Sequence, residues 1–204
     1  MHFAPNNIYH IYNQGNNKQL IFRKREDYLI FLSLYKRFFS STASTIAWCL
    51  MPNHFHFMIY ADERCSVKIK QGGIYIDPIT NSIRKLLSAY ARIYNNKYKQ
   101  TGSLFRQKTK VKCISAIEIK PNSPDLVQDY YVNCFHYIHQ NPMVAKLTAR
   151  LEDWEFSSFQ DYAGLRKGSL CQKDLAVLHC GYNPEGFISR SYEMANKKFI
   201  ELFA

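Results

Sequence analysis

Two histidines separated by one residue, His54 and His56, lie in a segment of apolar, β-forming residues. Side chains of a β-strand alternate between its two faces, so both imidazoles are expected on one face and Phe55 on the other. Two imidazoles at neighbouring positions can bind one metal ion and leave most of its coordination sphere open, as catalytic sites do. The alternative is a pair of ordinary strand histidines, one half-buried and one exposed.

Four segments rich in β-branched and aromatic residues predict β-strands. The histidine pair begins one of them, and the Pro52-Asn53 break before it permits a tight hairpin with the preceding strand. The predicted strands cover residues 8–13, 45–51, 54–61 and 108–115.

Three longer segments predict α-helices. The first, residues 26–40, has apolar residues at helical spacing, with acids at its start and bases near its end. The second begins at a capping residue, Asn81 or Ser82, and runs to about Lys99. The third begins at the Ser-Pro-Asp sequence of residues 123–125 and is expected to end near Asn141, because the next residue is a proline.

In chain order these elements are β-α-β-β-α-β followed by a helix, which is the order of the ferredoxin-like split β-α-β arrangement. We therefore expect an α+β fold with a central antiparallel sheet and helices packed on one of its faces. The polar, glycine-containing residues 62–78 predict a loop. Two short helices, at residues 173–179 and 191–203, predict a small helical C-terminal appendage.

The chain carries a strong excess of positive charge. Its 204 residues include 27 Lys and Arg against 16 Asp and Glu, a formal net charge of +11, which favours a polyanionic partner. No apolar run approaches the ~20 residues that span a bilayer, and residues 1–7 lack the layout of a signal peptide. We expect nucleic acid as the partner, no membrane, and a cytoplasmic protein whose cysteines, without a C-x-x-C pair, are reduced thiols.

Two segments carry side chains suited to nucleic acid. The second predicted helix interleaves aromatic and basic residues, among them Arg92 and Lys97, and single strands are bound through base stacking and phosphate neutralisation. The alternative is an amphipathic helix with aromatics toward the core and charges toward water. Farther along, Arg106, Lys108, Lys110 and Lys112 recur at every second residue as a basic stripe, although a solvated strand face would look similar.

Several motifs, in order along the chain, resemble those of the single-tyrosine HUH transposases, and most closely the REP-associated tyrosine transposases related to the insertion sequence 200 type. Residues 47–59 (AWCLMPNHFHFMI) resemble the signature hairpin of this family. Residues 9–15 (YHIYNQG) resemble the first strand of the family, and residues 102–108 (GSLFRQK) resemble its segment before the fourth strand. Residues 137–142 (YIHQNP) resemble its catalytic helix, and residues 154–158 (WEFSS) resemble a segment downstream of that helix.

The resemblance covers roughly residues 8–163. It implies a catalytic domain over residues 1–163 and leaves residues 164–204 as the appendage. It also implies a monomer or a homodimer, because relatives differ in whether the tyrosine helix acts within its own subunit.

The resemblance assigns Tyr137 as the nucleophile and His54, His56 and Asn141 as ligands of Mg²⁺ or Mn²⁺. Asn141 lies four residues after Tyr137 and so shares its helix face. Tyr130, seven residues before Tyr137, shares that face too and is the competing tyrosine. The flanking His136 and His139 are expected to be structural or to contact DNA. The expected DNA contacts are Asn13, Arg92, Lys97, Arg106, Lys108 and Lys110.

A phenol with a pKa near 10 is a weak nucleophile at neutral pH and needs nearby positive charge or a base. In the family, its attack on a phosphodiester leaves a 5′-phosphotyrosine and a free 3′-OH, so a second DNA end can later displace the tyrosine without ATP. The resemblance thus implies an endonuclease and strand transferase acting on single-stranded or hairpin DNA. Two alternatives stay open: a non-catalytic nucleic-acid-binding module, and a metal-dependent nuclease that uses water.

Overall fold

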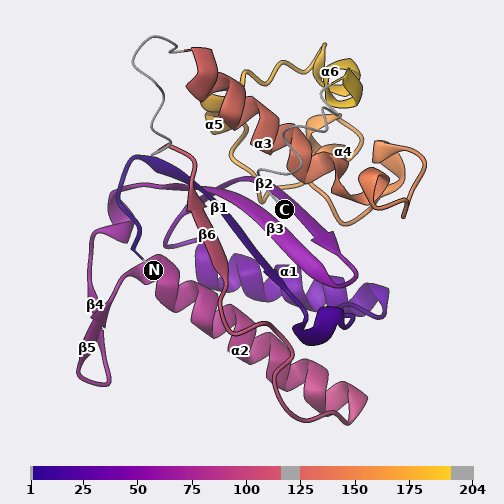
Figure 1. The fold of residues 1–204 in the computed structure, drawn as a ribbon. Coiled ribbons are helices and arrows are strands. Elements are labelled where there is room, and N and C mark those ends of the chain that lie inside the picture. The colour runs from indigo at the N-terminus through magenta and orange to yellow at the C-terminus, as the bar shows by residue number, and fades with distance from the viewer. Residues whose placement is uncertain (1, 116–124, 194–204) are drawn as a thin grey trace.

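The structure is a computed structural model that describes residues 2–115 and 125–193. A four-stranded antiparallel sheet lies at its centre, in the order β2-β3-β1-β6 (Figure 1). The strands are β1 (Asn7–Gln14), β2 (Ser44–Met51), β3 (His54–Ala61) and β6 (Lys110–Cys113). Because β3 lies between β1 and β2, the sheet has the predicted split β-α-β order, and the expected α+β class is confirmed.

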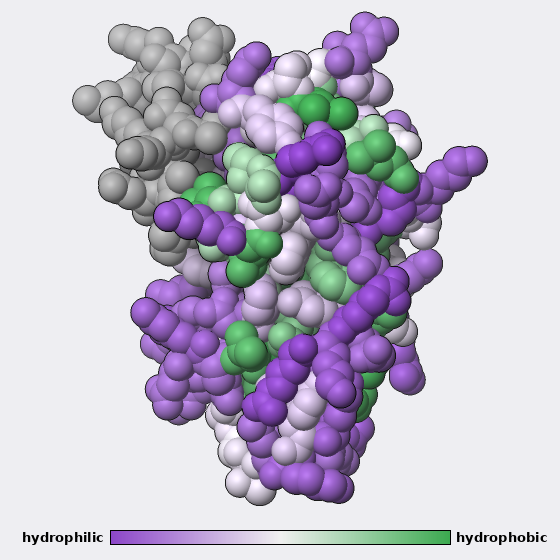
Figure 2. All heavy atoms as spheres, turned by 90° about the vertical axis from the view of Figure 1, so that its right-hand side faces the viewer, coloured by the Kyte–Doolittle hydropathy of each residue, from purple (hydrophilic) through white to green (hydrophobic). Residues whose placement is uncertain are grey.

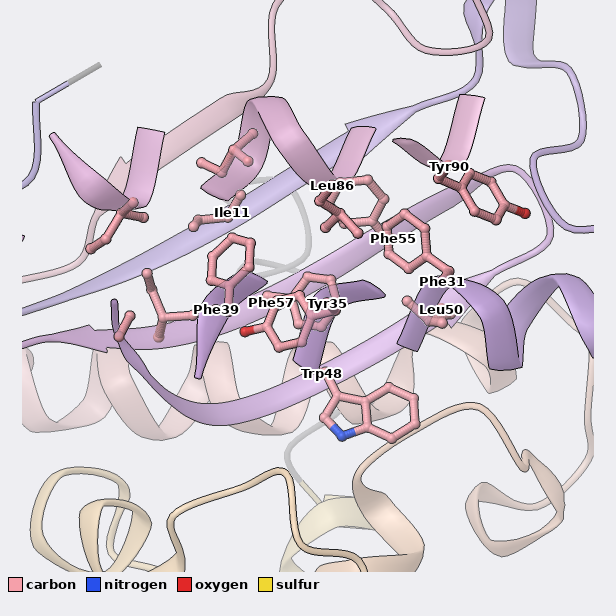
Figure 3. Close-up of a cluster of buried hydrophobic side chains, with 14 of the residues drawn as sticks. Ile11, Phe31, Tyr35, Phe39, Trp48, Leu50, Phe55, Phe57, Leu86 and Tyr90 are labelled. Atoms are coloured by element: carbon pink, nitrogen blue, oxygen red, sulfur yellow. The ribbon is translucent and has the colours of Figure 1, made fainter. Parts of the chain in front are cut away.

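One face of the sheet is covered by α1 (Arg25–Phe39) and α2 (Pro78–Tyr98), which pack against each other. Their buried side chains form an aromatic core with the facing strand residues; for example, the rings of Tyr35 and Phe57 stack at 3.9 Å between centroids (Figure 3). Phe55 belongs to this core, which places the residue between the two histidines on the α1–α2 face.

The opposite face is covered by α3 (Asp125–Val144), which packs on β2 and β3 (Figure 1). The expectation that helices cover only one face is therefore wrong. The physical reason is visible in β2, where every residue after Ser44 is buried. Trp48 and Leu50 join the α1–α2 core, whereas Cys49 and Met51 pack with α3, so the strand needs cover on both sides.

Two helix boundaries differ from the predictions. α2 begins at Pro78, because the carboxylate of Asp77 accepts the backbone N–H of Thr80 at 2.7 Å and caps the helix four residues before Asn81, the earlier of the two expected caps. α3 continues through Pro142 to Val144 instead of ending near Asn141. Its predicted start at residues 123 and 124 lies outside the described residues.

The expected loop at residues 62–78 contains regular structure. A short 3₁₀ helix (Glu63–Cys65) is followed by a hairpin of β4 (Ile69–Gln71) and β5 (Ile74–Ile76). Gly72 and Gly73 connect these strands with φ angles of 55° and 83°. Positive φ at both central residues is the requirement of a type I′ turn, which glycine meets without steric cost.

Residues after α3 wrap around its outer side. They form the 3₁₀ helix η3 (Leu151–Asp153) and the helices α4 (Phe159–Tyr162), α5 (Lys173–Cys180) and α6 (Phe187–Glu193). One further 3₁₀ helix, η1 (Asn16–Lys18), lies earlier in the chain, directly after β1. α5 and α6 pack on α3, and Phe187 joins the buried cluster around Phe135. The predicted helix at 173–179 agrees with α5, whereas most of the helix predicted at 191–203 lies outside the described residues.

The surface seen from the right-hand side of Figure 1 is largely hydrophilic, with apolar side chains gathered in separate patches (Figure 2). Among the described residues, no helix has both the length and the apolar composition needed to cross a membrane.

Candidate active site

His54 and His56 project from β3 toward the face that α3 covers, and their ring centroids lie 5.0 Å apart. They line one pocket of about 450 Å³. The remaining residues that line it are Tyr12, Asn13, Gln14, Arg106, Lys108, Lys110 and Tyr137. The pocket thus gathers the histidine pair, Tyr137 and three residues of the basic stripe, whereas Lys112 does not line it. With residues 12–14, the lining comes from four separate segments of the sequence.

Tyr137 enters the pocket from α3. Its ring centroid is 5.7 Å from that of His56, and the two rings are nearly perpendicular. The phenol is 8% exposed, and burial, followed by the charge of Cys134, raises its pKa above the ordinary value. A hydrogen bond from the Asn141 side chain lowers the same pKa, but burial dominates. The phenol therefore stays protonated at neutral pH unless a cation binds beside it.

Asn141 links the helix to the histidine pair. Its amide Nδ2 donates to the backbone oxygen of Tyr137 at 2.8 Å, one helical turn earlier. The Asn141 side chain also hydrogen-bonds the His54 imidazole, which raises the pKa of His54 against the larger effect of burial. Asn141 therefore contacts both the tyrosine and the first histidine.

Tyr130, the competing tyrosine, lies under Lys112, whose ammonium is 5.3 Å from the ring centroid. It does not line the pocket that holds His54 and His56. Burial is also the main cause that raises the pKa of Tyr130 above its ordinary value.

The imidazoles of the site are neutral at pH 7. Burial lowers the pKa of His54 to about 4. For His56, burial and then the charges of His10 and His54 hold the pKa well below its ordinary range. A neutral imidazole is the form that binds a metal ion, so these environments favour ligation over proton uptake.

The residues present fit a divalent cation. The Nε2 atom of His56 is buried and makes no hydrogen bond within the described part of the chain, so it can bind a metal ion when the ring proton is on Nδ1. Two neutral imidazoles and the amide oxygen of Asn141 form a mixed nitrogen and oxygen donor set, which suits Mn²⁺ better than Mg²⁺. Among the described residues no group of three or more His, Cys, Asp and Glu could hold a metal, so most of the shell would be left to the oxygens of water or of a substrate.

His10 and Tyr12 on β1 belong to the site, although neither is predicted from the sequence as a site residue. The Nε2 atom of His10 lies 2.9 Å from Nδ1 of His56, and the two rings stack. Tyr12 pairs with His56 across β1 and β3, and its ring stacks on His10. The alternation in the sequence YHIY already puts His10 and Tyr12 on one face of the strand. It identifies them as neighbours of His56 only once β1 is known to pair with β3.

Asn13 holds the basic stripe in position. Its amide donates to the backbone oxygen of Arg106 at 3.2 Å and to the hydroxyl of Thr109 at 2.9 Å. Because its amide makes these two hydrogen bonds, the main role of Asn13 at the pocket is to hold residues 106–109 against β1.

Arg92 and Lys97 lie apart from this pocket, on α2 beyond the opposite face of the sheet. Arg92 lines a separate pocket of about 330 Å³ together with Arg84 and Lys85. The ammonium of Lys97 forms an ion pair at 2.6 Å with the buried carboxylate of Asp27, near the start of α1. The structure thus does not bring these two predicted DNA contacts to the histidines.

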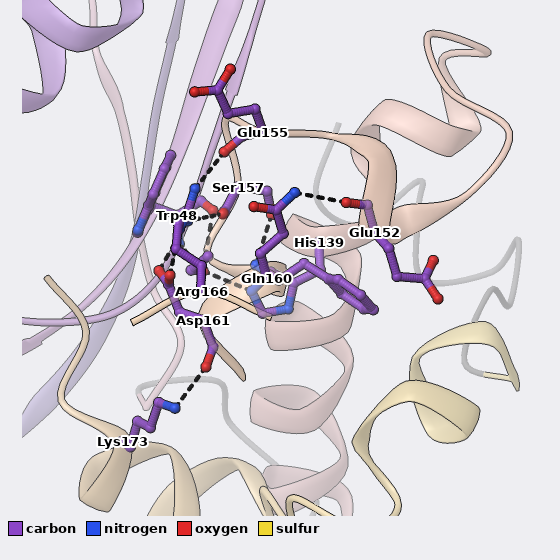
Figure 4. Close-up of polar contacts among 11 residues, drawn as sticks. Trp48, His139, Glu152, Glu155, Ser157, Gln160, Asp161, Arg166 and Lys173 are labelled. Carbon is purple, nitrogen blue, oxygen red and sulfur yellow. Dashed lines mark hydrogen bonds and ion pairs between the residues drawn. The ribbon is translucent and has the colours of Figure 1, made fainter. Parts of the chain in front are cut away.

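His136 and His139 face the C-terminal elements. His139 Nε2 lies 2.7 Å from the Ser158 hydroxyl, and His136 Nδ1 lies 2.9 Å from that of Ser191. Next to His139, Arg166 donates to the carboxylate of Asp161 and to nearby backbone oxygens (Figure 4). The two histidine contacts are buried and fasten α3 against the segments that follow it, whereas Arg166 ties residues 155–161 to one another.

The fold has a solved counterpart. A structure of a REP-associated tyrosine transposase bound to a REP hairpin matches with a TM-score of 0.54 at 13% sequence identity, over 84% of this chain and 94% of that one. At this identity the likeness shows a shared fold. By sequence, the chain matches no protein-family model and no curated protein.

Proposed function

We propose that the chain is a metal-dependent, single-strand DNA endonuclease and strand transferase of the tyrosine transposase kind. The observation that carries the proposal is the convergence of Tyr137, from α3, on the imidazoles of His54 and His56, from β3, in one pocket. A phenol, a pair of neutral imidazoles and a rim of positive charge are the groups that this reaction requires.

Each group of the pocket has a role in the proposed reaction. His54, His56 and Asn141 would hold Mg²⁺ or Mn²⁺, which when bound polarises the scissile phosphate and stabilises the charge that develops on its oxygens. The phenol oxygen of Tyr137 forms a bond to phosphorus while the bond from phosphorus to the 3′ oxygen breaks. The phenolic proton passes to water, and the departing 3′ oxygen takes up a proton to become a 3′-OH.

The second step reverses the first with a different DNA end. A 3′-OH attacks the phosphorus of the 5′-phosphotyrosine, the bond to Tyr137 breaks, and the phenol regains a proton. One phosphodiester is exchanged for another, so no ATP is consumed. Between the two steps the covalent bond to Tyr137, a largely buried side chain, keeps the 5′ end in the pocket.

The substrate of this proposal is single-stranded or hairpin DNA. Arg106, Lys108 and Lys110 line the pocket that holds Tyr137, where they can neutralise the phosphates on either side of the scissile bond. The formal net charge of +11 favours such a partner. The solved structure of the same fold is described with a REP hairpin bound, which supports hairpin DNA as the first substrate to try.

Mass analysis of the protein after incubation with hairpin DNA and Mn²⁺ tests the proposal. We expect a nucleotide adduct on Tyr137 and a new 3′-OH end in the DNA. Tyr137→Phe should lose both, whereas Tyr131→Phe, a matched change on the same helix outside the pocket, should keep both. Cleavage by Tyr137→Phe without any adduct would instead favour the nuclease that uses water, and DNA binding without cleavage would favour the non-catalytic module.

A further inference from the structure

We infer that the β4–β5 ribbon, residues 66–76, is a second contact for single-stranded DNA, in which the ring of Tyr75 stacks on an unpaired base while Lys68 and Lys70 neutralise neighbouring phosphates. The inference goes beyond the proposed reaction. It requires that the chain binds DNA, but not that Tyr137 cuts it.

The ribbon stands apart from the body of the domain. β4 and β5 pair with each other, and neither strand packs closely on another described element. Figure 1 shows the ribbon extending away from the sheet and its helices. Most of its side chains are therefore open to a ligand that approaches from solvent. A two-stranded ribbon without such cover is only marginally stable in water, so a ligand seated on it would also steady it.

One face of the ribbon joins an aromatic ring to positive charge. Lys70 is the direct partner of Tyr75 across the two strands, so the two side chains lie on the same face. Tyr75 is 65% exposed, and Lys68, two residues before Lys70, is exposed as well. Among the described residues, no ion pair includes either lysine, so both charges are left for a ligand.

The composition of the ribbon favours nucleic acid over a protein partner. Residues 66–76 contain two lysines and no acidic residue, in a chain with a formal net charge of +11. An exposed aromatic ring beside cations is the combination that binds single strands, through base stacking and phosphate neutralisation. Val67 and Ile74, which are 68% and 60% exposed, extend the apolar surface next to the ring, as expected of a binding surface. The base must be unpaired, because stacking on Tyr75 requires a base face that a duplex keeps covered.

The ribbon lies far from the histidine pocket. It follows the end of β3 at Ala61, whereas His56 is five residues earlier, a separation of about 17 Å along a strand. In Figure 1 the ribbon lies on the side of the sheet away from the β2–β3 turn. A DNA strand that reaches both places would contact the protein at two separate points, and an oligonucleotide that fills only the pocket would not reach Tyr75.

Two substitutions separate stacking from a general effect on the ribbon. Tyr75→Ser removes the ring, whereas Tyr75→Phe keeps a ring that can stack. Leu178→Ser, at a 68% exposed side chain on α5, is the matched control. Thermal unfolding of each variant checks that the fold is kept.

The affinity for a single strand is measured by fluorescence anisotropy in buffer without divalent metal, so that no cleavage is required. The oligonucleotide has about 20 nucleotides, longer than the ~16 that the largest single-strand sites cover. Loss of one stacked base should weaken binding about 5-fold to 100-fold in Tyr75→Ser, with affinities near the wild type in Tyr75→Phe and Leu178→Ser. A strand of the same length without bases should bind the wild type and Tyr75→Ser alike. Lys68→Ala and Lys70→Ala should each lower the slope of log K against log salt by about 0.7.

Equal affinity of the wild type and Tyr75→Ser, equal weakening in the serine and phenylalanine variants, or the same weakening for the strand without bases would overturn the inference. It would also be overturned if Tyr75→Ser kept its DNA affinity but changed self-association in sedimentation velocity or binding to phosphatidylserine vesicles, because the ribbon would then serve a second copy or a membrane surface. A wild type that binds no strand would remove this inference and the proposed function together. Weakened binding by Tyr75→Ser without any adduct on Tyr137 in the wild type would support the ribbon contact and remove only the proposed reaction.

Discussion

The aromatic ring of Tyr137 and the imidazole of His56 meet at an angle of 84°, one carried by a helix and the other by the sheet beneath it. Neither element alone contains the site. The pair exists because α3 packs on the face of the sheet opposite to α1 and α2.

The histidine pair is expected to control metal affinity and cleavage together. His54→Ala or His56→Ala removes one of the two imidazoles proposed to hold the cation. A bound cation stabilises the transition state of phosphodiester cleavage by several kcal/mol, which corresponds to about 100-fold or more in rate. Mn²⁺ binding and formation of the Tyr137 adduct should fall in parallel. A variant that no longer bound Mn²⁺ but still formed the adduct would show that the cation is not required.

One chain is expected to hold the complete site. The contact between Tyr137 and His56 lies within a single chain, so a mixture of the Tyr137→Phe and His56→Ala proteins should form no adduct. If the tyrosine helix were exchanged between two subunits, the mixture would rebuild one active site and label the His56→Ala chain. Mass analysis of the separated chains distinguishes these outcomes.

Stability is expected to fall as the pH drops from about 6.5 toward 4. Burial, with a smaller contribution from Lys112, lowers the pKa of His10 to about 3, and burial lowers the pKa of His54 and of His136 to about 4. The unfolded chain takes up protons on these residues near pH 6.5 and the folded chain does not, so their stabilising contribution is complete above pH 6.5 and is lost as the pH falls.

Each of these histidines contributes at most about 1.4 kcal/mol per pH unit within that window. Urea unfolding at pH 7, 6 and 5 measures the slope directly. His136→Gln should give a shallower dependence than the wild type, because one group that takes up a proton on unfolding is gone. The same slope in both proteins would contradict a neutral, buried His136.

The basic stripe is expected to set the salt dependence of DNA binding. Removing one side chain that neutralises a phosphate lowers the slope of log K against log salt by about 0.7 for single strands. Arg106→Ala, Lys108→Ala and Lys110→Ala should each reduce the slope by this amount and weaken different DNA sequences alike. Lys167→Ala, an exposed change outside the pocket, is the control.

An Arg92 variant tests whether the bound DNA also contacts α2, because Arg92 lies on that helix and lines a separate pocket. We expect Arg92→Ala to leave the salt slope for a short oligonucleotide unchanged. A reduced slope would mean that the DNA reaches across both faces of the domain.

The strand that carries the histidines can be predicted from sequence, because period-two alternation is a local property that requires no knowledge of the fold. The four strands and the first helix can be placed within a few residues for the same reason. The choice of sheet face for α3 is not local. It depends on which face of β2 remains uncovered, and a strand buried on both faces shows continuous apolar residues without alternation.

Two features of the site depend on pairing and are therefore missed from sequence. His10 is recognisable as a partner of His56 only through the register that sets β1 against β3. Lys97 is predicted to contact DNA from its place among aromatic residues, but its ion pair with Asp27 joins two segments that are far apart in sequence. Single-sequence patterns carry no information about such long-range contacts.

Asn141 and Tyr137 occupy neighbouring turns of one helix, tied by a hydrogen bond from the amide to the backbone. Any displacement of α3 would carry the side chains of Tyr137 and Asn141 away from the sheet in the same movement. In the proposed reaction, a shift of α3 would therefore change the distances from Tyr137 and from Asn141 to the histidine pair together.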